Sequence, residues 1–157
     1  MAKGRNDLPG ERTWYVVADS AQARILYMKR RGRRRRARLL KELAQPVPPT
    51  RDIVTDRRGS GRLRGGGRGY AMDSRSDPHE EQKRAFVREL ARLVSRAVLD
   101  HRCDELIVIA APRTLGELRG QLEGYARNRV VREIPKDLTC LSRAELEARL
   151  LQPTGLV

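Results

Sequence analysis

The sequence has few cysteines and few aromatic residues, and each scarcity excludes a class of protein. Only two of the 157 residues are cysteine, Cys103 and Cys140, and they form no Cys-x-x-Cys pair. Secreted domains held by disulfides usually carry more, so we interpret both as free thiols in a reducing compartment. Neither His79 nor His101 lies in a zinc-ligand pattern with them, so we expect no metal site. Aromatic residues make up 4% of the chain, too few for a large base-stacking platform.

Long apolar segments are also lacking. No apolar run approaches the ~20 residues that a transmembrane helix needs. The opening stretch MAKGRNDLPGERT lacks the apolar core of a signal peptide. We therefore expect a cytoplasmic protein that makes no membrane contact. The length is typical of one domain, which we expect at residues 13–152, between a flexible N-terminal tail at 1–12 and a C-terminal tail at 153–157.

Positive charge is what the sequence has in excess. Lys and Arg total 34 against 20 Asp and Glu, which gives a net charge of +14. Residues 29–75 hold 16 basic and 4 acidic residues, whereas the rest of the chain holds 18 and 16. A basic excess of this size is typical of proteins that bind polyanions, nucleic acid first. Its location predicts two basic protrusions, at 29–38 and 51–75, on a nearly neutral body.

Each basic segment is a candidate RNA-binding element. The first, KRRGRRRRAR, is either a hairpin tip that contacts phosphates or a solvated loop; we favour phosphate contact because guanidinium groups bind phosphate in a bidentate manner. The second contains RRGSGRLRGGGRGY, whose glycines allow the backbone to approach RNA closely. Tyr70, at its end, either stacks on a base or packs where the segment rejoins the body. The predicted nucleic-acid-binding residues are Arg33, Arg34, Arg35, Arg36, Arg57, Arg58, Arg62, Arg64, Gly65, Gly66, Gly67, Arg68 and Tyr70.

Hydrophobic patterning predicts an α/β domain. Strands are expected at residues 13–19, 23–29, 37–44, 104–112 and 129–134. A long helix should begin after Asp77 and Pro78, a short one at Thr114, and a last one after the capping box of Ser142 and Glu145. The resulting βββ-α-β-α-β-α order predicts a mixed five-stranded sheet with helices on its faces, the element order of the ribonuclease H-like fold.

No catalytic constellation emerges from the residues. A ribonuclease H-like nuclease would gather carboxylates around two metal ions. Asp19 ends the first strand, but the central strand ends in VIAAP without an acid, so we interpret Asp19 as a turn residue. The segment GGGRG matches neither common glycine-rich nucleotide motif. No cysteine can be placed with a base and an orienting group. We expect no catalytic residue, no metal and no cofactor.

Five stretches carry a family resemblance, and together they cover almost the whole chain after residue 13. They are WYVVADSAQARILY, DIVTDRRG, GGGRGYAMDSRSDPHEEQKRAFVRELA, DELIVIAAPRTLGELRGQL and VVREIPKDLTCLSRAELEARL. In these stretches the sequence resembles the bacterial host attachment proteins (protein required for attachment to host cells). That family is similar to the middle domain of archaeal and eukaryotic class-1 peptide chain release factors. The resemblance implies a fold like that middle domain.

The resemblance also carries an expectation about function. In class-1 release factors a Gly-Gly-Gln loop precedes a long helix, enters the ribosomal peptidyl transferase centre and assists hydrolysis of peptidyl-tRNA. By position its counterpart here is Gly66, Gly67 and Arg68, so the glutamine is absent, which argues against hydrolysis. We expect a protein that docks on the ribosome or tRNA through the Arg/Gly-rich segment. The alternatives are a peptidyl-tRNA-hydrolysing release or ribosome-rescue factor and a host-cell attachment factor.

Overall fold

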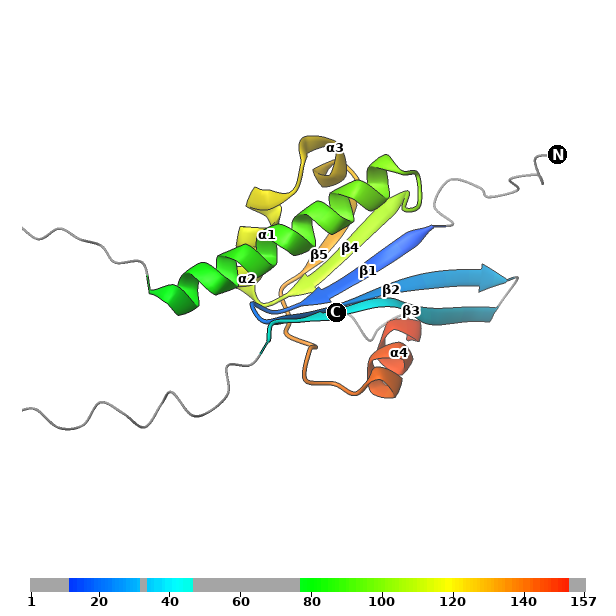
Figure 1. Cartoon of the computed structure of the whole chain (residues 1–157). Helices are drawn as coiled ribbons and strands as arrows, with labels where there is room; N and C mark the ends of the chain where they lie inside the picture. The colour runs from blue at the N-terminus through cyan, green and yellow to red at the C-terminus, as the bar shows by residue number, and fades with distance from the viewer. Residues whose placement is uncertain (1–11, 32–33, 47–76, 153–157) are drawn as a thin grey trace, which may run out of the picture.

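A computed structural model describes residues 12–31, 34–46 and 77–152 of the chain (Figure 1). The strands are β1 (Thr13–Ala18), β2 (Gln22–Arg31), β3 (Arg34–Ala44), β4 (Glu105–Ala110) and β5 (Val130–Ile134). The helices are α1 (Pro78–Leu99), α2 (Pro112–Gln121), α3 (Gly124–Arg127) and α4 (Arg143–Leu151). The described elements therefore follow the predicted order, with the short α3 added before β5.

The strands form one mixed sheet in the order β3-β2-β1-β4-β5. β1 pairs with β2 and β2 with β3 in antiparallel fashion, as a meander does. β4 lies parallel to β1, and β5 lies parallel to β4, because each follows a helical crossover. This arrangement confirms the predicted mixed five-stranded α/β fold.

Two apolar cores lie on the two faces of the sheet. Alternate residues of β1 separate between them: Trp14 and Val16 belong to the core that includes residues of α1, α2 and α3, whereas Val17 belongs to the core that includes residues of α4. Figure 1 shows α1 and α4 on opposite faces of the sheet. β1 and β4 are covered on both faces, which explains the continuous apolar run of β4. α1 covers β1 and part of β2, where Ala23 and Ile25 are buried, whereas Leu40 and Lys41 of β3 are exposed.

Helix α1 begins and ends as local sequence signals dictate. Asp77 is the N-cap, and its carboxylate accepts a hydrogen bond from the His79 N–H at 3.0 Å. At the other end, His101 N–H donates to Val98 O at 3.1 Å and Arg102 N–H donates to Ala97 O at 2.9 Å. These two bonds form a Schellman motif with His101 in the left-handed position, φ 55°, where glycine is usual. The turn fixes the direction in which the chain leaves α1.

Two boundaries differ from the sequence-based predictions. β2 and β3 continue through much of the arginine run, up to Arg31 and from Arg34, because cross-strand pairing extends the hairpin beyond its apolar part. α2 begins at Pro112 and not at Thr114, since proline fits the first turn of a helix. The capping box of α4 is confirmed. None of the helices in the described residues is long and apolar enough to cross a bilayer.

Candidate nucleic-acid interface

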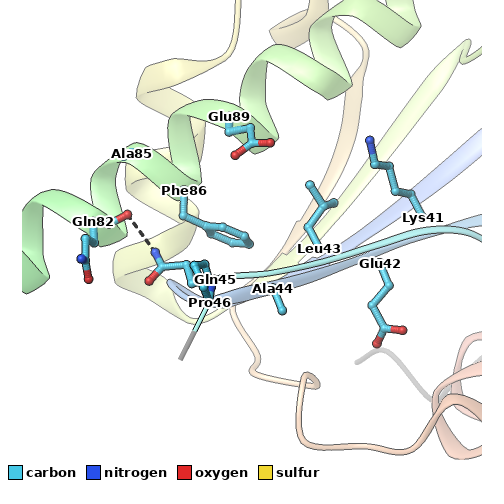
Figure 2. A pocket seen from close by; sticks show the side chains of 10 residues that line it. All are labelled: Lys41, Glu42, Leu43, Ala44, Gln45, Pro46, Gln82, Ala85, Phe86 and Glu89. Atoms are coloured by element: carbon cyan, nitrogen blue, oxygen red, sulfur yellow. Dashed lines mark hydrogen bonds between the residues drawn. The ribbon is translucent and has the colours of Figure 1, made fainter. Parts of the chain in front are cut away.

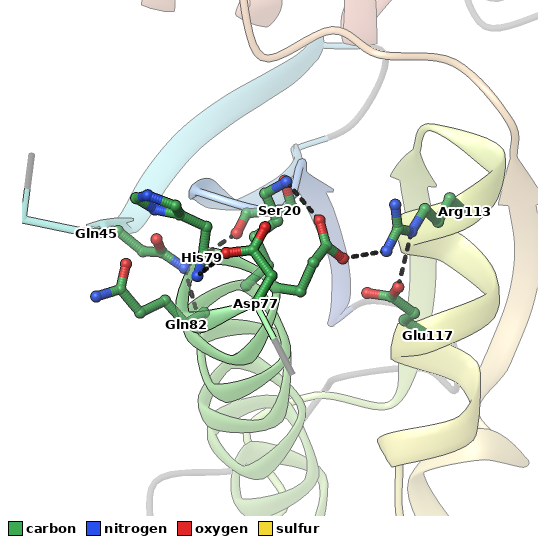
Figure 3. A network of polar contacts seen from close by, with 9 residues as sticks. Ser20, Gln45, Asp77, His79, Gln82, Arg113 and Glu117 are labelled. Carbon is green, nitrogen blue, oxygen red and sulfur yellow. Dashed lines mark hydrogen bonds and ion pairs between the residues drawn. The ribbon is translucent and has the colours of Figure 1, made fainter. Parts of the chain in front are cut away.

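The chain between β3 and α1, which contains the basic segment at 51–75, is attached to the body at one corner. β3 ends just before Gln45, and α1 begins just after Asp77. The Gln45 side-chain amide donates to the backbone carbonyl oxygens of Ser20 at 3.1 Å and Gln82 at 2.8 Å (Figure 3). Its backbone N–H donates to Ala21 O at 2.7 Å. The end of β3 is therefore tied to the start of α1, and the segment leaves and rejoins a single fixed corner.

A network of ion pairs holds the start of α1 against the start of α2. The Glu80 carboxylate accepts from Lys83 Nζ at 2.8 Å and pairs with Arg113 across the helix interface. Arg113 Nε also donates to Glu117 at 3.1 Å (Figure 3). Hydrogen bonds from Lys83 and Arg113 hold the pKa of Glu80 below its ordinary value. These contacts hold the first turn of α1, the helix that follows the basic segment, against α2.

Beside this corner lies a pocket of about 490 Å³ between β3 and α1 (Figure 2). Leu43 and Phe86 provide its apolar surface, while Gln45 and Gln82 close it at the corner. Lys41, Glu42 and Glu89 also line it, so its charge is mixed. A strongly anionic ligand has no advantage in this pocket, and we assign it no ligand.

Asp19 acts as a turn residue, as its sequence context predicts. Its carboxylate accepts hydrogen bonds from the N–H groups of Ala21 at 2.6 Å and Gln22 at 2.7 Å, and from the Thr139 hydroxyl at 3.0 Å. Partial burial raises the pKa of Asp19, but these hydrogen bonds outweigh it and leave the pKa below its ordinary value. In the part of the chain that the structure describes, no group of three or more His, Cys, Asp or Glu side chains could hold a metal ion.

The arginine run lies on the β2–β3 hairpin, at the opposite end of β3 from Gln45. Arg31 pairs with Arg34, and Lys29 pairs with Arg36, whereas β1 begins only opposite Met28. The run therefore forms a two-stranded ribbon that extends past the rest of the sheet (Figure 1). With 11 residues in β3, the far end of the ribbon and the Gln45 corner are about 35 Å apart at ~3.3 Å per residue.

Most of the predicted RNA-binding residues lie outside the described residues. Among those that the structure describes, Arg34, Arg35 and Arg36 lie in β3, and Arg36 is exposed. The residues outside are Arg33, Arg57, Arg58, Arg62, Arg64, Gly65, Gly66, Gly67, Arg68 and Tyr70. The sequence does not predict the role of Gln45. The stretch QPVPPT indicates only that regular structure ends there, and not which carbonyl groups accept hydrogen bonds from the amide.

This chain matches one protein family and is similar to solved structures. Residues 12–150 match bacterial archaeo-eukaryotic release factor family 12. Among solved structures, an archaeal translation termination factor, aRF1, is similar over 79% of this chain with 15% identity and a TM-score of 0.45. A second, described as an archaeal protein, is similar over 90% with 16% identity and a TM-score of 0.43. The chain spans 30% and 34% of the lengths of these two proteins. The curated proteins contain no match.

The family match extends from the residue before β1 to the last turn of α4, so it covers all the described strands and helices. It confirms the prediction of a release-factor-like domain. The name of the host attachment proteins, by contrast, has no support in the comparisons. The chain belongs to bacterial archaeo-eukaryotic release factor family 12.

Proposed function

We propose that this protein acts at the ribosome as a release or ribosome-rescue factor of the archaeo-eukaryotic type. The observation that carries the proposal is the attachment of the Arg/Gly-rich segment. It joins the body between β3 and the long helix α1, at a corner that Gln45 ties together. Membership of a release-factor family supports the same proposal.

In this proposal the segment at 51–75 is the part that meets ribosomal RNA or tRNA. Gly65, Gly66 and Gly67 let the backbone approach RNA, because glycine adopts conformations that other residues avoid. The arginines that neutralise phosphates are Arg57, Arg58, Arg62, Arg64 and Arg68. The side chain of Tyr70 stacks on a base.

The ribbon of the β2–β3 hairpin provides a second RNA contact, through Arg33, Arg34, Arg35 and Arg36. Because it lies about 35 Å from the Gln45 corner along β3, one partner that meets both ends must present phosphates over that span. A large folded RNA does so, whereas a single short stem does not. Ribosomal RNA and tRNA are both folded RNAs that span more than this distance, so the proposal covers both.

A second candidate function is docking on the ribosome or tRNA without hydrolysis. The specific observation in its favour is Arg68, which stands where the Gly-Gly-Gln loop of release factors carries glutamine. Release of peptide from stalled ribosomes separates the two functions, since only the first produces free peptide.

Binding is tested by co-sedimentation with ribosomes across a salt series. Arg62, Arg64 and Arg68 are changed together to Gln in one variant. A matched control carries Gln at Arg84, Arg88 and Arg92, which are exposed on α1. This control loses the same three positive charges as the loop variant. We expect the loop variant to bind more weakly and to lower the slope of log K against log salt by about 2 to 3. Equal binding by the two variants would contradict the assignment to this segment.

An attachment role, implied by the first resemblance, remains a prediction with a simple test. Recovery of the protein with polysomes after cell fractionation would contradict it, and recovery on the cell surface would support it.

A further inference from the structure

A second groove lies beside α1, on the same face of the sheet. Its floor is apolar and combines Trp14 of β1, Tyr27 of β2 and Leu40 of β3, with Leu93 of α1 as a wall. Leu40 is the extra residue where the register between β2 and β3 shifts, and it is 41% exposed. The groove has a volume of about 500 Å³, within the range of small-ligand sites.

The rim of this groove is positively charged. Arg12, Arg38, Lys41 and Arg102 line it, and its described lining includes no acidic residue. Arg12 is neutralised by Asp104, with Nε 2.7 Å from the carboxylate. Within residues 12–31, 34–46 and 77–152, the other three make no ion pair with a carboxylate. Their charge is therefore available to an anionic ligand.

Arg102 is held in place over the apolar floor. Its guanidinium carbon lies 5.9 Å from the centroid of the Trp14 ring, a cation–π contact. Its backbone is fixed by the bond from its N–H to Ala97 O in the Schellman turn after α1. A fixed cation at the mouth of an apolar groove is suited to a ligand that is apolar at one end and anionic at the other.

We propose that this groove binds one nucleotide of a single-stranded RNA. The base covers the apolar floor beside Tyr27 and Leu40, and the flanking phosphates meet Arg38, Lys41 and Arg102. A nucleotide joins a flat, largely apolar base to phosphates, which arginine binds in a bidentate manner. An acidic peptide carries the charge but leaves the apolar floor uncovered, so the observations favour RNA.

The groove lies between the ribbon of the β2–β3 hairpin and the Gln45 corner. Lys41 lines both this groove and the pocket beside the Gln45 corner, so the groove lies partway along β3. A single strand that runs along β3 from the ribbon to the Gln45 corner would pass over it. The inference goes beyond the proposed function, because it holds whether or not peptide is released and is tested without ribosomes.

The test uses Trp14, the single tryptophan of the chain, which lies on the floor of the groove. The 157-residue chain is titrated with short oligouridylate while Trp14 fluorescence is followed. Separately, anisotropy of a labelled oligomer reports binding anywhere on the protein. We expect a saturable change of fluorescence, and about tenfold weaker binding by that signal for the Arg38→Gln, Lys41→Gln double variant, the loss of about one charge-assisted hydrogen bond. Arg88→Gln, on an exposed part of α1 outside the groove, should leave it unchanged.

One further ligand and one variant test the contact between the base and the apolar floor. An abasic oligomer of the same charge should bind the groove more weakly than oligouridylate, and Leu40→Ser should remove that difference. Leu40 is exposed enough for the variant to fold, which circular dichroism checks.

Three results would overturn the proposal. The first is saturated anisotropy without a fluorescence change, and the second is equal fluorescence titrations with oligouridylate and the abasic oligomer. The third is an equal response to oligoglutamate, which would assign the groove to acidic peptides. None of them bears on peptide release, so this proposal can fail while the proposed function stands.

Discussion

Gln45 offers the sharpest test of how the basic segment is attached. The change Gln45→Ala removes the side-chain hydrogen bonds to Ser20 O and Gln82 O and leaves the backbone bond to Ala21 O in place. A net contribution of ~1 kcal/mol for each bond would give about 2 kcal/mol. Gln45 is only half-buried, so water partly replaces the amide and the expected loss is about 1 to 1.5 kcal/mol.

Urea unfolding followed by circular dichroism measures this loss. With an m value of ~2 kcal/mol/M, the midpoint should fall by about 0.6 M, with no change in m. Gln82→Ala is the matched control, because it removes an exposed amide and keeps the carbonyl that accepts from Gln45. We expect the control to shift stability by less than about 0.5 kcal/mol.

The effect should also be local. Hydrogen exchange should accelerate at the first turn of α1, where Glu81 N–H donates to Asp77 O at 3.0 Å, by about tenfold if the lost energy is local. An unchanged midpoint together with unchanged exchange in Gln45→Ala would refute the claim that Gln45 ties β3 to α1.

Three further predictions follow from single residues. His101→Gly should raise the stability of the protein by about 1 kcal/mol in urea unfolding, because glycine adopts the left-handed position of the Schellman turn without a steric penalty; a lower midpoint would argue against that turn. Burial raises the pKa of the Cys103 thiol to about 12, so near neutral pH a thiol reagent should label only the exposed Cys140 until denaturant is added. Rapid labelling of both would contradict the burial of Cys103. Because the pKa of Asp19 is lowered, its contribution to stability should be complete above the unfolded value of 3.8 and be lost as the pH falls through its lower folded value. Asp19→Asn should therefore lower the free energy of unfolding by about 1 to 2 kcal/mol near neutral pH. It should also make the free energy of unfolding fall less as the pH is lowered; an equal fall with pH in both proteins would count against this.

Local signals in the sequence predict much of this fold. Asp77 with Pro78, and Ser142 with Glu145, mark helix starts that the structure confirms, because caps depend on neighbouring residues alone. The apolar run of β4 likewise indicates a strand covered on both faces. Asp19, a turn residue by its local sequence, is confirmed as one.

Features that depend on residues far apart in the chain could not be predicted from the sequence. The strands extend to Arg31 and Arg34 because each provides the other with hydrogen bonds, although their charges suggest a loop. Arg38 and Arg102 line one groove because of the register of the sheet and the turn after α1, and no spacing in the sequence indicates this.

Release of peptide from stalled ribosome–nascent chain complexes tests the central claim most directly. The 157-residue chain should release labelled peptide above a buffer control, and Arg68→Gln, which restores the Gly-Gly-Gln pattern, should release it faster. Arg88→Gln, which removes the same charge from α1, should match the unchanged protein. No release by either the unchanged protein or Arg68→Gln, under conditions where both bind the ribosomes, would contradict the release or rescue function and leave docking without hydrolysis.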